Sequence, residues 1–338
     1  HQVNGESGEM LSSVECHALR GIAILGIFLH NYCHWLPGIV RENEYQFFQN
    51  NVNAFNHTLL NPDWKLPIHL LSFFGHYGVP VFLFFSAYGL SMKYEKKGTN
   101  APFLHVPRVS FMRYHFLKLF RMMIAGFAAF VLVDQITPGA FHYQVVDIVG
   151  QLGLINNFFP HPDKSIWPGP YWFFGMLFQL YVFYRLLLYK RSNYWTVILM
   201  SLCVFGQFLL DPEGEALNWY RYNFMGSMLP FCCGLIFARK QGTILKWRKK
   251  IGECQLDWSV LILSFIFIYV LSLNFFTWAL VPVCVCSFCI SLVKVFDYSH
   301  LNIINHALAW LGKISAALFV CHPITRKIFI PISRHGDL

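Results

Sequence analysis

Long apolar runs recur along the whole chain and constrain its fold more than any other feature. Hydrophobic residues make up 56% of the sequence and charged residues only 13%, whereas a soluble domain carries about 25% charged residues. A hydrocarbon core of about 30 Å needs about 20 predominantly apolar residues in a helix. Because runs of this kind recur, the sequence predicts an all-α fold, a polytopic transmembrane helical bundle with nine to ten spans.

The nine predicted spans cover most of the chain. They are 19–36, 69–91, 116–133, 171–189, 194–210, 222–238, 258–273, 277–294 and 309–330. Residues 1–12 are polar at their start and are expected to form a disordered leader or an artificial remnant. Residues 13–338 are expected to form a single membrane domain that lacks its last helix.

A tenth apolar stretch, residues 141–159, is interpreted differently. Counting it as a span would place Lys190 and Arg191 on the outer side and invert every later loop. We therefore interpret the region around 141–170 as a re-entrant or interfacial segment. Irregular backbone at membrane depth is tolerated where protein or water satisfies it, as in the wall of a cavity.

The distribution of basic residues predicts the orientation. Lysines and arginines concentrate in the connections 92–115 and 239–256, which are expected to be cytoplasmic. The connection 211–221 is acidic, and the connection 37–66 has little basic excess. The sequence thus predicts a multi-pass protein of the cell's inner (plasma) membrane with a cytoplasmic N-terminus.

Ten cysteines do not point to disulfides or a metal site. Seven of them lie within apolar helical runs, where small buried thiols are ordinary. No pair has the spacing and partners of a zinc site. We expect free cysteines and no metal.

His30 lies deep in the first span. It follows Arg20 by ten residues, which corresponds to about 15 Å along a straight helix. His34 lies one turn further on, on the same face. Ionisable groups inside a membrane are costly and often mark a reaction site or pathway. A neutral imidazole can accept a proton from an attacking hydroxyl, although a histidine can also serve only to join helices.

Four cations lie near the predicted cytoplasmic ends of the first and third spans. They are Arg20, Arg113, Lys118 and Arg121. Lys118 and Arg121 share a helical face, and guanidinium groups bind phosphate oxygens bidentately. These residues are candidates for binding a nucleotide-like donor, although positive-inside topology alone would also place cations there.

Two further segments combine small or kinking residues with a histidine. His76 precedes a run that contains Ser86 and Tyr88, and His322 stands directly before Pro323. Small residues allow close helix packing, and a proline frees a backbone carbonyl one turn back. Each segment can line a cavity or can simply be a packed, kinked helix.

Taken in order along the chain, these motifs resemble the acyltransferase 3 family over roughly residues 15–325. The matching features are Leu19-Arg20-Gly21-Ile22-Ala23 with a deep histidine, Gly78-Val79 followed by Phe84-Phe85-Ser86-Ala87-Tyr88, Lys118-x-x-Arg121, Trp172 at the head of a span, and Ile314-Ser315 running to His322-Pro323. The resemblance implies a membrane acyltransferase, commonly bacterial. Such an enzyme moves an acyl group, most commonly acetyl, from cytosolic acyl-CoA to an exported glycan or a lipid-linked sugar.

Two positions depart from the family pattern. The family's histidine usually follows the arginine by eleven positions, where this chain has Asn31, so either His30 or His34 can be the functional group. The glutamate that many members carry in the tryptophan-led span is replaced by Leu177, with Gln179 nearby.

The resemblance assigns roles to the candidate residues. His30 and His34 are the catalytic candidates, as general base or as transiently acylated nucleophile. Arg20, Arg113, Lys118 and Arg121 are expected to bind acyl-CoA (acetyl-CoA), a co-substrate and not a tightly bound cofactor. The residues expected to line the acceptor site or cavity are His76, Ser86, Tyr88, Trp172, Gln179 and His322.

The expected partners are a coenzyme A thioester, a cell-envelope glycan or lipid-linked sugar, and the lipid bilayer, with no nucleic acid. Two alternatives from other classes stay open. The same intramembrane histidines can serve a transporter or lipid-handling membrane protein. They can also belong to a scaffold subunit in which polar residues only hold helices together.

Overall fold

The computed structural model of the chain describes residues 9–96 and 106–334. Every regular element in these two ranges is helical, which confirms the all-α prediction. The chain divides into two compact units, each assembled from three stretches of sequence. Unit 1 comprises His1–Leu25, Tyr77–Leu104 and Leu229–Ser315, and unit 2 comprises Gly26–His76, His105–Met228 and Ala316–Leu338.

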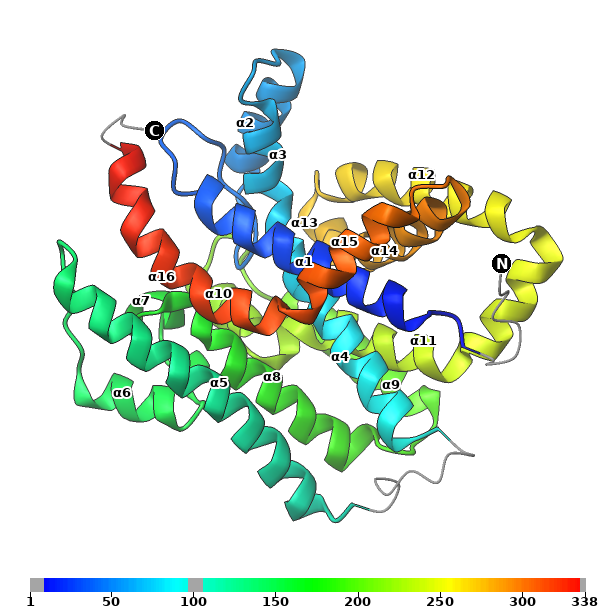
Figure 1. The fold of residues 1–338 in the computed structure, drawn as a ribbon, viewed down its shortest axis with the longest axis horizontal. Helices are drawn as coiled ribbons and strands as arrows, with labels where there is room; N and C mark the ends of the chain where they lie inside the picture. The colour runs from blue at the N-terminus through cyan, green and yellow to red at the C-terminus, as the bar shows by residue number, and fades with distance from the viewer. Residues whose placement is uncertain (1–8, 97–105, 335–338) are drawn as a thin grey trace. The chain divides into compact units, whose positions relative to one another are not determined.

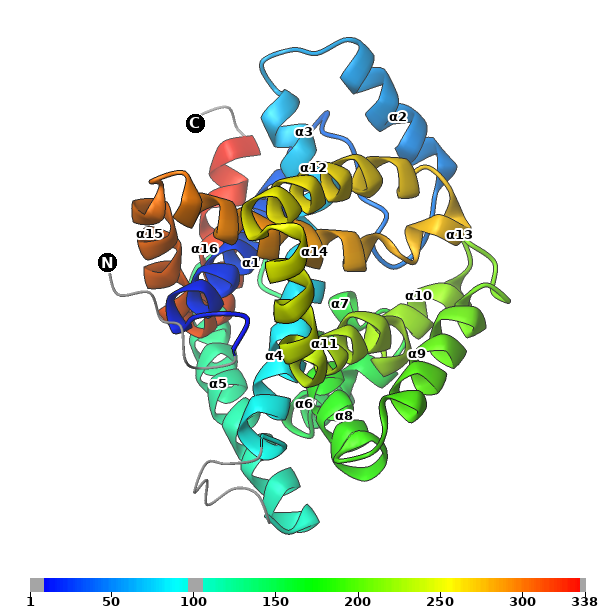
Figure 2. The ribbon, with the colours of Figure 1, turned by 90° about the vertical axis from the view of Figure 1, so that its right-hand side faces the viewer.

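Unit 1 contains the first part of α1 (Ser13–Cys33) and most of the C-terminal half of the chain. Its other helices are α4 (Gly78–Tyr94), α11 (Phe224–Ile251), α12 (Glu253–Leu271), α13 (Phe275–Trp278), α14 (Val281–Tyr298) and α15 (Asn302–Lys313). Helices α12 and α14 pack side by side along their length (Figure 2). The core contains Cys286 and Cys289, and all ten cysteines of the chain are free thiols, as predicted.

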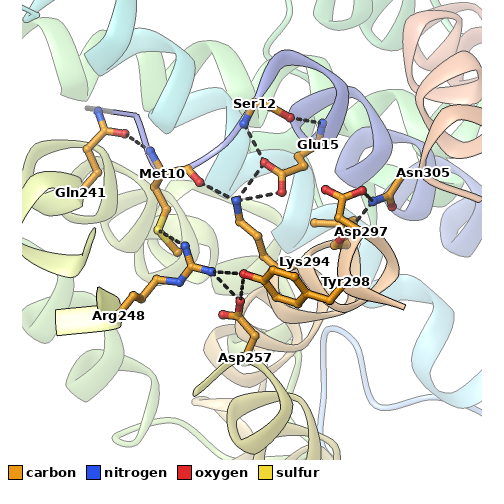
Figure 3. A network of polar contacts seen from close by, with 11 residues as sticks. Met10, Ser12, Glu15, Gln241, Arg248, Asp257, Lys294, Asp297, Tyr298 and Asn305 are labelled. Atoms are coloured by element: carbon orange, nitrogen blue, oxygen red, sulfur yellow. Dashed lines mark hydrogen bonds and ion pairs between the residues drawn. The ribbon is translucent and has the colours of Figure 1, made fainter. Parts of the chain in front are cut away.

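A capping box starts α1 and fixes the chain in front of it. The Ser12 hydroxyl accepts a hydrogen bond from the Glu15 backbone N–H (3.2 Å), and the Glu15 carboxylate accepts one from the Ser12 N–H (2.7 Å). Lys294 of α14 donates to the Met10 carbonyl at 2.7 Å and pairs with Glu15 at 2.8 Å (Figure 3). Residues 1–8 of the predicted leader lie outside the described ranges, but Met10 and Leu11 are part of the core of unit 1.

A second ion pair in the same network joins α11 to α12. Arg248 of α11 pairs with Asp257 of α12 at 2.5 Å, and both contact the hydroxyl of Tyr298 (Figure 3). Arg248 is almost completely buried. A buried charge is tolerated when it is paired and hydrogen-bonded, as Arg248 is here. These contacts hold α11, α12 and α14 together within unit 1.

Unit 2 contains the second part of α1 and a larger set of helices. They are α2 (Gln49–Leu60), α3 (Leu66–Phe74), η1 (Gly75–Tyr77), α5 (Arg108–Ile136), α6 (Val145–Leu152), η2 (Asn156–Phe158), α7 (Pro162–Ser165), η3 (Gly169–Tyr171), α8 (Trp172–Phe183), the π-helical turn η4 (Tyr184–Leu188), α9 (Asn193–Gln207), α10 (Glu215–Tyr222) and α16 (Ser315–Arg334). Helices α5 and α8 lie side by side (Figure 1).

Side-chain contacts tie α16 to both of these helices. The Tyr171 hydroxyl, at the head of α8, donates to the Val320 carbonyl at 2.7 Å. The fully buried carboxylate of Asp134 on α5 pairs with Lys327 at 3.0 Å. These two contacts hold the last described helix against the centre of unit 2.

The structure offers fewer clear spans than the nine to ten predicted. Within the described residues, six helical segments are long and apolar enough to cross a membrane: Ser13–Cys33, Leu66–Tyr94, Arg108–Ile136, Gly169–Leu188, Glu253–Leu271 and Val281–Tyr298. A seventh is possible if the pair Asn302–Lys313 and Ser315–Ile332, bent by 70°, counts as one span. The chain is a polytopic helical membrane protein.

The remaining two predicted spans fall on helices that miss this test. The predicted span 194–210 corresponds to α9, which has only 15 residues. The predicted span 222–238 is the apolar first part of α11, whose second part carries the basic cluster that ends in Arg248, Lys249 and Lys250. Crossing by these two segments stays a prediction.

The region around 141–170 is not a single spanning helix. It is broken into α6, η2, α7 and η3, which are separated by irregular backbone. This agrees with excluding 141–159 from the full spans. Its placement as a re-entrant or interfacial segment stays a prediction.

Helices α1 and α15 approach each other through two glycines in unit 1. A Cβ atom added to Gly21 would lie 2.0 Å from the Leu308 carbonyl oxygen, and one added to Gly312 would lie 1.8 Å from the His17 carbonyl oxygen. Backbone atoms cannot move aside as a side chain can. Only glycine at both positions permits this close packing, which is a common device between membrane helices.

We predict that Gly312→Ala destabilises the protein by about 1–3 kcal/mol, because the added methyl group forces the two backbones apart. Gly242→Ala is the matched control, since Gly242 lies in α11 with no atom within 4 Å of its added Cβ. Thermal unfolding in detergent should show a lowered midpoint for Gly312→Ala alone. Equal midpoints for the two variants would contradict the packing argument.

Candidate active site

His30 is held in one orientation by a backbone carbonyl. It lies near the end of α1, is 3% exposed, and its Nδ1 lies 2.9 Å from the carbonyl oxygen of Ser72 on α3. Because a carbonyl only accepts hydrogen bonds, Nδ1 must carry the proton. The other ring nitrogen, Nε2, therefore points its lone pair into the site when the ring is neutral.

His34 and Glu42 converge on that nitrogen. His34 Nδ1 lies 3.1 Å from His30 Nε2 and 3.2 Å from Glu42 Oε1, and Glu42 Oε1 lies 3.8 Å from His30 Nε2. A single N–H on His34 faces two acceptors. When both rings are neutral, this N–H can satisfy only one of the two acceptors, His30 Nε2 or Glu42 Oε1. The cluster can therefore accept one more proton.

A second carboxylate lies two residues further along the same loop. Glu44 Oε2 is 3.9 Å from His30 Nε2, and the side chain is only 16% exposed. Burial and the nearby charge of Glu42 raise the pKa of Glu44 to about 8. Burial alone would also raise the pKa of Glu42, but the hydrogen bond from His34 and the positive charge that His30 and His34 carry when protonated outweigh it and hold this pKa below its usual range. At neutral pH, Glu42 is ionised and Glu44 keeps its proton.

His76 completes this group, which we call the histidine–carboxylate cluster (His30, His34, His76, Glu42 and Glu44). The ring centroids of His76 and His30 are 5.4 Å apart. The approach of η1 to α1 depends on Gly75, because an added Cβ there would lie 2.7 Å from both the Gly26 carbonyl oxygen and His30 Cβ. A glycine next to His76 thus lets the cluster form.

Contacts with α10 and the turn before it hold the loop that carries the carboxylates. Arg221 Nε donates to the Glu44 carbonyl at 2.6 Å, and the Phe47 N–H donates to the Pro212 carbonyl at 2.8 Å. Tyr45 stacks on Tyr222 with centroids 3.8 Å apart and meets the edge of Trp172 at 5.6 Å. The loop is therefore held by both hydrogen bonds and aromatic packing.

The cluster has the donor set of a metal site. The ligand atoms of His30, His34 and Glu42 lie within 4.8 Å of one another. Two histidines and a glutamate hold the zinc ion of several hydrolases, and the Ser72 carbonyl would orient His30 as an outer-shell partner does. These three residues could hold a divalent cation, a possibility that the sequence did not indicate.

The four cations predicted to bind the donor are divided between the units. Arg20 lies in unit 1 and is partly exposed, whereas Arg113, Lys118 and Arg121 lie on an exposed face of α5 in unit 2. The buried face of α5 instead carries His115, Leu119 and Met123. The last three cations form one exposed stripe, and their joint action with Arg20 stays a prediction.

The predicted acceptor-lining residues have different surroundings. Trp172 contacts the cluster's loop through Tyr45, and His322 of α16 packs against Phe28 with centroids 6.5 Å apart. Ser86 and Tyr88 belong to unit 1, where Tyr88 is part of the hydrophobic core. Gln179 accepts a hydrogen bond from the Phe224 N–H at 3.1 Å and donates to Asn223, so it has a structural role in joining α8 to the start of α11.

Sequence reasoning missed both carboxylates of the cluster. The signal was the pair Glu42-x-Glu44 in the connection that follows the histidine-bearing span. These two carboxylates can contact the histidine of the preceding span if the loop returns to the end of that helix. Nothing in the sequence alone specifies that return.

Comparison with known proteins gives the family. The family model for the acyltransferase domain, acyltransferase 3, matches residues 15–338. No curated protein and no solved structure matches the chain. Since the family match runs from the first turn of α1 to the end of the sequence and includes every residue of the histidine–carboxylate cluster, the chain belongs to the acyltransferase 3 family.

Proposed function

We propose that this protein is a membrane O-acyltransferase that moves an acyl group from cytosolic acyl-CoA to a hydroxyl of an exported glycan or lipid-linked sugar. The observation that carries the proposal is the buried His30, whose Nδ1 proton is committed to the Ser72 carbonyl and whose Nε2 faces an ionised carboxylate. A general base needs a lone pair that can accept the proton, and a nearby negative charge favours the protonated form of the imidazole.

The reaction needs one proton to move. The acceptor hydroxyl attacks the thioester carbonyl, a C–O bond forms, and the C–S bond breaks to release coenzyme A. The hydroxyl proton passes to the histidine–carboxylate cluster, which can accept one more proton, and then to the departing thiolate. Glu42 stabilises the imidazolium that exists between these two steps, because opposite charges a few ångströms apart attract strongly in a buried site.

The donor enters from the cytoplasmic side in this proposal. The phosphates of acyl-CoA bind near the exposed cations of α5, and the acyl end reaches toward His30, with acetyl as the expected group. The positive-inside distribution of basic residues supports this orientation. His30 then lies nearer the outer side, and only the acyl group crosses the barrier.

Three other mechanisms use the same residues. His30 can be acylated and pass the group on, a divalent cation on His30, His34 and Glu42 can activate the hydroxyl, or the histidines can serve a transporter. With radiolabelled acetyl-CoA and no acceptor, a stable protein-bound label would favour the first of these. Loss of transfer with a chelator and its return with zinc would favour the second, and solute movement without thioester loss the third.

We predict that His30→Ala lowers acyl transfer by about 10²–10⁴-fold, as expected for the loss of a general base. Coenzyme A binding should persist, because the donor phosphates bind elsewhere. His34→Ala should have the smaller effect if His30 is the base, and the larger effect if the roles are reversed. His57→Ala, an exposed histidine on α2, is the matched control. Wild-type turnover in both cluster variants would refute the proposed chemistry.

We predict that Glu42→Gln and Glu44→Gln differ. The first removes a charge-assisted hydrogen bond to His34, worth about 1.5–3 kcal/mol, and should slow transfer by about 10–150-fold. The second resembles the protonated carboxyl that Glu44 has at neutral pH and should keep transfer within about threefold of wild type, well under 1 kcal/mol. Steady-state rates at pH 7 on the same acceptor test this. Equal losses would contradict the assignment of one ionised and one neutral carboxyl.

We predict that Arg121→Ala and Arg20→Ala each weaken coenzyme A binding by about 1.5–3 kcal/mol, the value of a charge-assisted hydrogen bond. Binding should also weaken as salt concentration rises. Arg191→Ala, another exposed cation on the predicted cytoplasmic side, should bind normally. Calorimetric titration with coenzyme A provides the measurement, and unchanged affinity in both variants would leave these residues with a purely topological role.

A further inference from the structure

A cavity of about 270 Å³ adjoins the histidine–carboxylate cluster within unit 2. Its wall begins at Trp35, the residue after His34, and the two side-chain rings are 5.5 Å apart. The other lining residues come from α5, α16 and the segment between α5 and α8, and they include Phe141, Trp167, Arg326 and Lys327. A ligand in this cavity would lie next to the proposed base.

Arg326 lies between two tryptophan rings in this wall. Its guanidinium carbon is 5.6 Å from the ring centroid of Trp35 and 5.5 Å from that of Trp167, within the range of cation–π contacts. One guanidinium nitrogen donates to the Asn31 side chain at 3.0 Å. The side chain is only 7% exposed, so the stacked rings and Asn31 hold the guanidinium in one place.

No carboxylate in the part of the chain that the structure describes pairs with Arg326. The neighbouring Lys327 differs, because Asp134 neutralises it at 3.0 Å. A buried cation is costly unless an anion compensates it. Arginine presents several N–H groups in a planar fork that fits a carboxylate or phosphate, and only one of them is used by Asn31. The wall therefore presents one uncompensated, pre-oriented positive charge to the cavity.

The remaining walls are flat and aromatic. Trp167 stacks on Phe141 with centroids 4.6 Å apart and an interplanar angle of 16°. Binding pockets typically combine apolar and aromatic walls with a few placed polar groups. Pockets for drug-sized ligands have volumes of about 300–1,000 Å³, and this cavity is slightly smaller. It therefore suits one sugar ring and not a long oligosaccharide.

We infer that this cavity is the acceptor subsite and that it selects a sugar residue that carries an anionic group. The sugar ring packs on the tryptophan faces, and its carboxylate or phosphate pairs with Arg326. A ring hydroxyl then faces the cluster across Trp35 and His34. This inference rests on the proposed acyltransferase function, to which it adds the class of the acceptor.

The test measures binding without acyl-CoA, so it does not depend on turnover. Methyl β-D-glucuronide and methyl β-D-glucoside differ only at C6, which is a carboxylate in the first and a hydroxymethyl group in the second. Each is titrated against the purified protein by saturation-transfer NMR. The glucuronide should bind at least tenfold more tightly to wild type, and glucose 6-phosphate should share this preference if the site reads charge alone. Arg326→Gln should remove the preference, Arg326→Lys should keep part of it, and the exposed Arg191→Gln should leave it unchanged.

Equal affinity for the glucuronide and the glucoside, or no binding of either by wild type, would overturn the inference. The comparison of ligands on wild type decides this even if Arg326→Gln fails to fold. The two proposals fail separately: selective binding by a protein that never consumes acetyl-CoA would refute the acyltransferase function alone. Acyl transfer to envelope glycans with no anion preference would refute the subsite alone.

Discussion

The hydrogen bond from His30 Nδ1 to the Ser72 carbonyl is the contact on which the arrangement of the histidine–carboxylate cluster depends. It determines which ring nitrogen keeps its lone pair and directs that nitrogen toward His34 and Glu42. The contact exists because α3 and η1 come very close to α1, at Gly26 and Gly75, where a larger side chain would meet backbone atoms. Two glycines thus permit the helix approach that assigns the proton of His30 to Nδ1.

The carboxylates beside His30 come from a loop and not from a membrane helix. The tryptophan-led span has no glutamate, but its Trp172 contacts Tyr45, which directly follows Glu44. The loop is held by Arg221 and by aromatic stacking on Tyr222. A charged group on a loop is less costly to keep ionised than one on a lipid-facing helix, since the loop can position several hydrogen-bond donors around it. This explains how two acidic groups can be retained next to a buried imidazole.

The end of α1 connects the cluster to the aromatic cavity. His30 and His34 face the carboxylates, while Asn31 and Trp35 contact Arg326 of α16. Neighbouring residues of this helix end, about 100° apart around its axis, therefore belong to the proposed reaction centre and to the proposed acceptor subsite. Helix α16 is itself held by contacts with Tyr171 and Asp134. Such fixed positioning lowers the entropic cost of bringing an acceptor hydroxyl to a base.

Sequence patterns alone were enough to predict the all-α membrane class, the exclusion of 141–159 from the full spans, and the pairing of His30 with His34. The first follows from hydropathy over one helix length, the second from the distribution of basic residues between loops, and the third from the rise of a helix over four residues. Three features became visible only in the folded chain. Glu42, Glu44 and Ser72 surround His30, Gln179 is structural, and Ser86 and Tyr88 belong to the other unit. The number of clear spans was also lower than the number predicted from hydropathy, because α9 is short and α11 carries charge over its second part. Contacts between distant segments depend on where loops return and how closely backbones approach, and hydropathy does not encode either.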